Sequence, residues 1–245
     1  MFSQLASAFR ILLVLTILTG LIYPAVVTGI AQTVFPTQAH GSLVSVGGRV
    51  VGSSLIGQGF ARPEYFHPRP SSAGGGYDAS ASGGSNLGPT SARLMNGTTR
   101  KDDKGREVAD FDGIKDRIVH YCLDNGIAYE SSVPLDAFKG ADGALDDAKL
   151  IAAFNDEKAP LVFTAKAPIP ADAVTASASG LDPHVSPANA EIQVARVANA
   201  RGATEDAVRA IVAQWTERAW LGFIGEPRVN VLELNIALDQ KLPRK

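Results

Sequence analysis

The sequence contains a single cysteine, Cys122, among its 245 residues. One cysteine excludes an internal disulfide and a metal site built from several thiolates. An excess of basic residues is also lacking, because 23 Lys and Arg stand against 25 Asp and Glu, for a net charge of −2. Such a chain has no general electrostatic attraction for nucleic acid, and we expect no nucleic-acid partner.

Charged residues are absent from Ile11 to Gly48, and the first acidic residue is Glu64. Residues 11–35 form an apolar run that spans about 37 Å as a helix, against about 30 Å for the hydrocarbon core of a bilayer. We predict a transmembrane helix over 11–35, after a short cytoplasmic N-terminus (1–10) and before an extracytoplasmic domain (36–245). A signal peptide cleaved after Ala31 is the alternative, but its apolar region is normally shorter.

The orientation of the span rests on the few cations that flank it: Arg10 and the terminal amine lie on one side, and the next cation is Arg49. The positive-inside rule places the N-terminus in the cytoplasm. We therefore expect a single-pass protein of the cell (inner) membrane, with the bulk of the chain in the periplasm.

Small or helix-kinking residues recur at every fourth position of the span, at Thr16, Gly20, Pro24 and Thr28. Small side chains let a second helix approach closely in lipid. Pro24 also frees the carbonyl of Gly20, which a neighbouring helix can satisfy. We predict that this face packs against a partner helix.

The rest of the chain indicates an α+β domain, with strands near its start and helices behind them. Glycine pairs divide 41–60 into two or three short strands, and 61–90 is typical of loops. The charged stretch 98–107 is typical of a solvated loop. Helices are expected over 110–125 and 145–154, and a strand over 161–163. Trp215, Trp220 and Phe223 are expected in the core, with an interface patch as the alternative.

The last third carries clear helix boundaries. Ser186 before Pro187 predicts a capped helix that ends at Gly202, and Thr204 predicts the cap of the next helix. Residues 229–238 fit either a strand or a helix.

Three patterns suggest chemistry. The loop 83–90 resembles a P-loop, but Pro89 stands where the phosphate-binding lysine is required, which favours a structural turn. Asp182, His184 and Ser186, with Ser177 and Ser179 nearby, supply the residue types of a serine hydrolase without its nucleophile elbow, so a helix-capping turn is favoured. The four histidines show no second ligand at metal-site spacing, and we expect no metal site.

Several long strings then point to a family. In chain order they are LTGLIYPAVVTGIAQTVFP (18–36), GSLV (41–44), VVGSSLIGQGF (50–60), EYFHPRPS (64–71), ASGGSNLGPT (81–90), VTASASGLDPHVSPANAEIQVARVANARG (174–202) and LGFIGEPRVNVLELNIALD (221–239). In these strings the chain resembles the KdpC family, the C chain of the potassium-transporting P-type ATPase complex. Residues 91–174 depart from the family pattern, and we interpret them as containing an insertion in a single external domain.

The resemblance implies a non-catalytic accessory subunit that assembles with a channel-like, potassium-binding subunit and a P-type ATPase subunit in the lipid bilayer. It implies no intrinsic cofactor, since ATP, K⁺ and Mg²⁺ belong to the assembled complex. Two roles remain open: a catalytic chaperone that raises ATP affinity, for which the family is described as ATP-binding, or a cap on the external potassium entrance. The alternative is a membrane-anchored extracytoplasmic serine hydrolase.

The resemblance also implies that the external loops bearing the family motifs are candidate contacts with the partner subunits. These residues are Tyr65, Phe66, His67, Arg69, Ser85, Asn86, Asp182, His184 and Ser186.

Overall fold

The computed structural model describes residues 2–243 and divides the chain into two compact units, Met1–Leu55 and Ile56–Lys245. Each unit is described by itself below.

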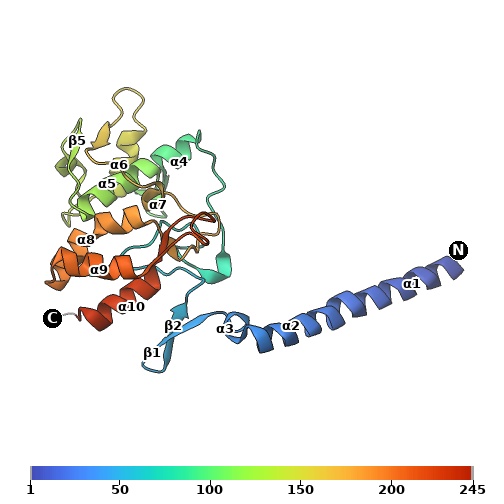
Figure 1. Ribbon diagram of the computed structural model, residues 1–245. Helices are drawn as coiled ribbons and strands as arrows, with labels where there is room; N and C mark the ends of the chain where they lie inside the picture. The colour runs from blue at the N-terminus through green and yellow to red at the C-terminus, as the bar shows by residue number, and fades with distance from the viewer. Residues whose placement is uncertain (1, 244–245) are drawn as a thin grey trace. The chain divides into compact units, whose positions relative to one another are not determined.

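The first unit begins with a long apolar helix. Gln4–Val34 has 31 residues and a mean hydropathy of 2.3, and none of its apolar window is buried. It is therefore long and apolar enough to cross a bilayer. It comprises α1 (Phe2–Ile17), a π-helical turn η1 (Leu18–Ile22) and α2 (Tyr23–Val34) (Figure 1).

Pro24 explains the π-helical turn. In a regular α-helix its ring clashes with the carbonyl four residues earlier, that of Gly20. The wider turn avoids this clash, and the backbone N–H of Tyr23 instead donates to the carbonyl of Leu18, five residues back.

A short helix and a β-hairpin complete the first unit: α3 (Pro36–Ala39), β1 (Leu43–Val46) and β2 (Arg49–Ser53). The two strands pair antiparallel. Gly47 and Gly48 join them with φ angles of 59° and 77°, the left-handed backbone that a two-residue hairpin turn requires. This hairpin confirms the short strands expected from the glycine pattern.

The second unit contains a larger core built from three helices and a small sheet. The helices are α8 (Pro187–Arg201), α9 (Glu205–Gln214) and α10 (Val231–Lys241), coloured orange to red in Figure 1. The antiparallel sheet has the order β7 (His184–Val185), β9 (Arg228–Asn230), β8 (Thr216–Glu217). The buried core residues include Phe66, Val194, Val208, Val229 and Leu234.

The helix boundaries of this core follow the predicted caps. The hydroxyl of Ser186 accepts from the N–H of Asn189, and that of Thr204 accepts from the N–H of Ala207. Residues 229–238 form both of the alternatives considered, because β9 ends at Asn230, whose side chain caps α10.

Residues 91–174 have a small core of their own, formed by Val119, Leu135, Leu150, Phe154 and Leu161. The elements of this region are α4 (Ala92–Asn96), β3 (Thr98–Lys101), β4 (Glu107–Phe111), α5 (Ile114–Asp124), β5 (Tyr129–Ser131), η3 (Leu135–Phe138), α6 (Asp147–Phe154), β6 (Phe163–Ala165) and α7 (Ala171–Val174). The 3₁₀-turn η2 (Ala79–Ala81) lies in the preceding loop. The mixture of helices and short strands agrees with the α+β class, whereas the insertion stays a prediction.

Two local expectations were wrong. Residues 98–107 are not a loop, because β3 and β4 pair as a hairpin whose turn is closed by Asp102, which accepts from the N–H groups of Lys104 and Arg106. Trp220 and Phe223 are not core residues, since they are 68% and 77% exposed.

Candidate functional site

The predicted packing face of the membrane helix is unobstructed. No atom of another part of the described chain lies within 4 Å of a Cβ placed on Gly20. Residues four apart drift by about 40° around an α-helix. The wider π-turn between Leu18 and Ile22 takes up part of this drift, which keeps Gly20 and Pro24 closer to one line. The common packing face of Thr16, Gly20, Pro24 and Thr28 stays a prediction.

In the second unit, the motif segment 64–71 is held in place by side chains instead of strand pairing. The amide of Asn235 accepts from the N–H of Phe66 at 2.9 Å and donates to its carbonyl at 3.0 Å. Gln193 makes the same two contacts with the backbone of His67, at 2.7 and 3.1 Å. Both amides are 1% exposed, so they pair these backbone groups from inside the domain.

Three residues of this segment make their contacts within the domain itself. Phe66 is fully buried, so the structure gives it a packing role and no surface for a partner. The Tyr65 hydroxyl donates to Asp239 at 2.9 Å, and the Arg201 guanidinium lies over the Tyr65 ring at 5.2 Å. The ring of His67 lies 3.1 Å from the carbonyl of Arg62, and burial, followed by the charge of Arg196, lowers the pKa of His67.

Arg69, Asp182, His184 and Ser186 come together at a cavity of about 500 Å³, which Glu226, Pro227 and Arg228 also line. Arg69 donates to Asp182 at 2.8 Å, and the N–H of His184 donates to the same carboxylate at 3.0 Å. The His184 imidazole, followed by its backbone N–H and Arg69, lowers the pKa of Asp182 to about 2 against the effect of burial. These contacts fix the carboxylate of Asp182 between two motif segments that are distant in the sequence, 64–71 and 174–202.

The same geometry does not assemble a hydrolase triad. The Ser186 hydroxyl donates to Asp172 at 2.9 Å while it caps α8, and the Ser177 hydroxyl lies 3.3 Å from that of Ser179. Among the described residues, no hydrogen bond joins His184 to any of these serines. A base in contact with its nucleophile, which acyl transfer requires, is therefore missing from this arrangement.

The loop that contains Ser85 and Asn86 packs backbone to backbone against residues 177–180. The N–H of Gly83 donates to the carbonyl of Ser179 at 2.9 Å, and a Cβ on Gly84 would lie 2.9 Å from the carbonyl of Ala178. Glycine is needed here for close approach of two chains, which agrees with a structural turn. Asn86 is exposed in this loop, with a φ of 55°, and Ser85 is half-buried.

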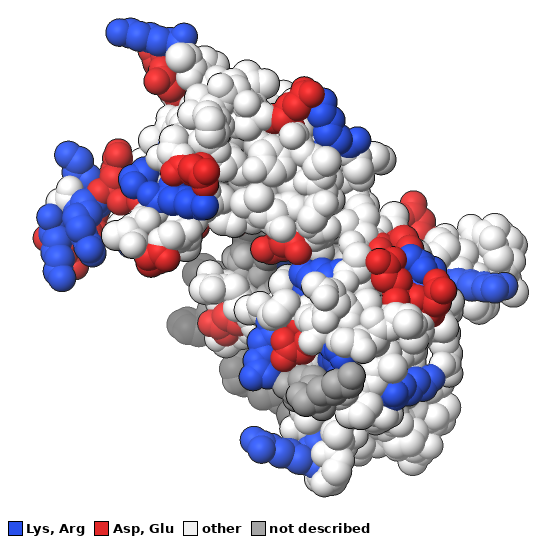
Figure 2. Space-filling model, turned by 90° about the vertical axis from the view of Figure 1, so that its left-hand side faces the viewer, with Lys and Arg blue, Asp and Glu red and all other residues white. Residues whose placement is uncertain are grey.

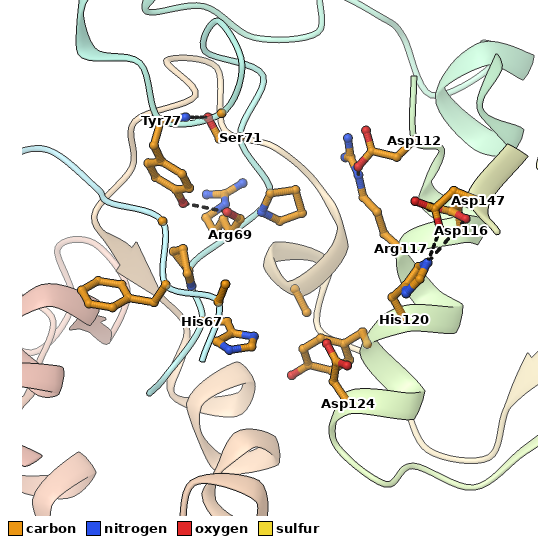
Figure 3. A pocket seen from close by; sticks show the side chains of 18 residues that line it. His67, Arg69, Ser71, Tyr77, Asp112, Asp116, Arg117, His120, Asp124 and Asp147 are labelled. Carbon is orange, nitrogen blue, oxygen red and sulfur yellow. Dashed lines mark hydrogen bonds and ion pairs between the residues drawn. The ribbon is translucent and has the colours of Figure 1, made fainter. Parts of the chain in front are cut away.

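A larger cleft, of about 710 Å³, has the motif segment as one wall and α5 as the other (Figure 3). His67, Arg69 and Tyr77 lie on the first wall, and Asp116 and His120 on the second. The Tyr77 hydroxyl donates to the carbonyl of Arg69 at 2.6 Å, and burial raises its pKa.

The α5 wall carries a cluster of charged groups. The Nε2 atom of His120 lies 2.9 Å from Asp147 and 3.9 Å from Asp116. Burial raises the pKa of Asp116 to about 6, although the charge of His120 opposes this shift. The hydrogen bond to Asp147, followed by the charge of Asp116, raises the pKa of His120 against burial.

The comparisons with known proteins all give the same family, over nearly the whole chain. The family profile described as "KdpC: K+-transporting ATPase, c chain" matches residues 5–137 and 128–240. The potassium-transporting ATPase KdpC subunit of Beijerinckia indica subsp. indica is 46% identical over 99% of this chain and 96% of its own length. The chain belongs to the KdpC family. The KdpC subunits of Koribacter versatilis and Myxococcus xanthus are 42% and 44% identical over 98% of this chain, and over 96% and 90% of their own lengths.

Membership of the KdpC family makes the chain a subunit of a potassium-transporting ATPase, with an accessory role. The alignments to these KdpC subunits span nearly all of both chains, so residues 91–174 lie within the aligned length. They also cover the helix face and the motif segments described above.

Sequence reasoning about this KdpC chain missed one group of residues and gave a second only as an alternative. The statement that no histidine has a ligand at metal-site spacing is wrong, since Asp116 precedes His120 by four positions. The second group is the apolar tip Trp220–Ile224, in which the exposed fractions of Trp220, Leu221, Phe223 and Ile224 are 68%, 66%, 77% and 47%. The glycines at 222 and 225, both with positive φ, signal a turn that projects these side chains outward.

Proposed function

We propose that this chain assembles with a channel-like potassium-binding subunit and a P-type ATPase subunit, and that its domain caps the external potassium entrance. One observation carries the proposal: the 31-residue apolar helix has no buried stretch of its own. In the bilayer, the exposed apolar surface of a membrane subunit is covered by lipid and by partner helices. The helix face Thr16, Gly20, Pro24 and Thr28 supplies the close approach to the channel-like subunit.

The apolar tip Trp220–Ile224 supports a contact outside the bilayer. Four large apolar side chains at one turn are an interaction surface of the kind that anchors protein interfaces. On the face of the molecule in Figure 2, by contrast, basic and acidic residues lie side by side, as expected of a solvated surface. The tip is therefore the part of the domain that we assign to the partner subunit.

The orientation is part of the proposal: N-terminus in the cytoplasm, Ile56–Lys245 in the periplasm, and ATP on the opposite side from the domain. An introduced cysteine at the exposed Ser80, in a Cys122→Ser background, should react with a membrane-impermeant maleimide in intact cells. Labelling only after cell lysis would contradict the proposed orientation.

The assembly is tested by co-purification. A C-terminally tagged chain, extracted from its native membrane in mild detergent, should recover both partner subunits and potassium-stimulated ATPase activity. Gly20→Leu should reduce the recovery severalfold, because the larger side chain blocks close helix approach. Gly29→Leu is the matched control, since nine residues at about 100° each place it on a different side of the helix. Equal recovery of the two variants would contradict the proposed face.

The same preparation separates the remaining roles. If the domain is a cap, altering the tip should change the potassium dependence of ATPase activity. If the chain is a catalytic chaperone, altering it should change the KM for ATP. A fluorophosphonate probe that labels Ser177, Ser179 or Ser186 would instead support the hydrolase.

A further inference from the structure

Three potential metal ligands converge on the α5 wall of the larger cleft: Asp116 and His120 from α5, and Asp147 from the start of α6. One oxygen or nitrogen of each lies within 4.8 Å of the others. A spacing of four residues places Asp116 and His120 on one side of their helix. The fold then brings Asp147 to them from a separate element, so the three groups face one another (Figure 3).

Asp116 is the unusual member of this cluster. Its side chain is only 3% exposed, yet its Oδ1 atom accepts no hydrogen bond from any described residue. Burying a carboxylate that accepts no hydrogen bond is costly, and His120 Nε2, at 3.9 Å, lies within ion-pair distance of Asp116 but beyond hydrogen-bond distance. Buried charges are normally paired or coordinate a metal. The adjacent Arg117 does not pair with it, because its guanidinium donates to Asp112 and to the carbonyl of Val174.

We propose that Asp116, His120 and Asp147 bind a divalent transition-metal ion of the Zn²⁺ or Mn²⁺ class. Imidazole nitrogen with carboxylate oxygen suits these ions, whereas Mg²⁺ and Ca²⁺ prefer oxygen ligands alone. Ligands bound at about 2.1 Å in tetrahedral geometry lie about 3.4 Å apart. The distances of 2.9 and 3.9 Å from His120 Nε2 to the two carboxylates bracket that value.

The exposure of the other two ligands keeps such an ion accessible. The side chains of His120 and Asp147 are 39% and 47% exposed, and both line the cleft. Coordination positions beyond the three side chains are therefore open to water or to a group presented by a partner. The ion ties α5 to α6 on the wall that faces His67 and Arg69.

The test uses the full-length chain in detergent with an affinity tag that contains no histidine. After treatment with a chelator, the chain is titrated with Zn²⁺ by calorimetry and with Co²⁺ by visible absorption. We expect one saturable site with a Kd below about 10 μM. Asp116→Asn and His120→Gln should each weaken binding at least tenfold and abolish the Co²⁺ bands.

Two control variants address non-specific binding. Asp124→Asn removes a carboxylate of the same cleft that lies outside the cluster, and His40→Gln removes an exposed histidine. Both should bind Zn²⁺ like the parent chain. Circular dichroism establishes that each variant is folded. Absence of saturable binding to the folded parent chain, or equal binding by all four variants, would overturn the proposal and leave the cluster as a charged triad.

Discussion

Replacing Asp182 by asparagine tests how the motif segments are joined. The carboxylate accepts from Arg69, 113 positions away, at 2.8 Å, and from the N–H of His184 at 3.0 Å. Its side chain is 28% exposed, so solvent screens these contacts only in part. A pKa lowered from 3.8 to about 2 corresponds to about 2 kcal/mol of stabilisation of the folded state. We expect Asp182→Asn to lose up to about 2 kcal/mol at neutral pH.

The pH dependence has a definite sign. The folded-state pKa of Asp182 lies below the unfolded value, so its stabilisation is present above pH 3.8 and is lost as the pH falls through about 2. The difference in unfolding free energy between parent and variant should therefore be largest at neutral pH and shrink in acid.

Urea unfolding of the full-length chain in detergent measures this difference. Trp215 and Trp220 both lie in the unit Ile56–Lys245, so their fluorescence reports on the relevant domain. Asp206→Asn is the matched control, because Asp206 pairs with Arg209 while 95% exposed and should change stability by less than about 0.5 kcal/mol. Equal effects of the two substitutions, or an Asp182 effect independent of pH, would refute the reasoning.

Three further outcomes are expected. Phe66→Ala should cost about 3–5 kcal/mol in urea unfolding, because it empties a fully buried aromatic site; a loss below 1 kcal/mol would contradict that role. Asn235→Leu keeps the number and branching of the side-chain heavy atoms but leaves the N–H and carbonyl of Phe66 unpaired, so a loss of about 2 kcal/mol or more is expected in the same assay. Phe223→Ser should leave the unfolding free energy within about 0.5 kcal/mol, since the side chain is 77% exposed, and should lower the recovery of partner subunits; unchanged recovery would remove the tip from the proposed interface.

Local signals in the sequence predicted the helices of the larger core well. Ser186 and Thr204 cap α8 and α9 as expected, and Gly202 ends α8 with a φ of 61°. Such boundaries depend on a few neighbouring residues, so they are visible without knowledge of the fold. The 229–238 segment was ambiguous for the same reason, because it contains both a strand end and a helix start.

Contacts between distant segments were beyond such reasoning. Nothing in EYFHPRPS shows that Gln193 and Asn235, more than 120 positions away, bind its backbone. The Asp116–His120 spacing was visible, but the approach of Asp147 depends on how α5 and α6 pack. The exposure of Trp220 and Phe223 likewise contradicts the usual preference of aromatic residues for the interior, and the sequence favoured the core over the interface patch.

The π-helical turn also sets the rotational phase between the two halves of the membrane helix. Because it holds one residue more than a regular turn, deleting one residue within Leu18–Ile22 would restore a uniform α-helix. The deletion would leave α1 and α2 close to their present rotational phase, because the wider turn takes up the extra residue, and it would return Pro24 to its clash with the carbonyl four positions earlier. Residues before and after this turn thus belong to two helical frames that differ by one residue, and a partner that contacts both halves meets side chains that a regular α-helix of the same sequence would not place on one side.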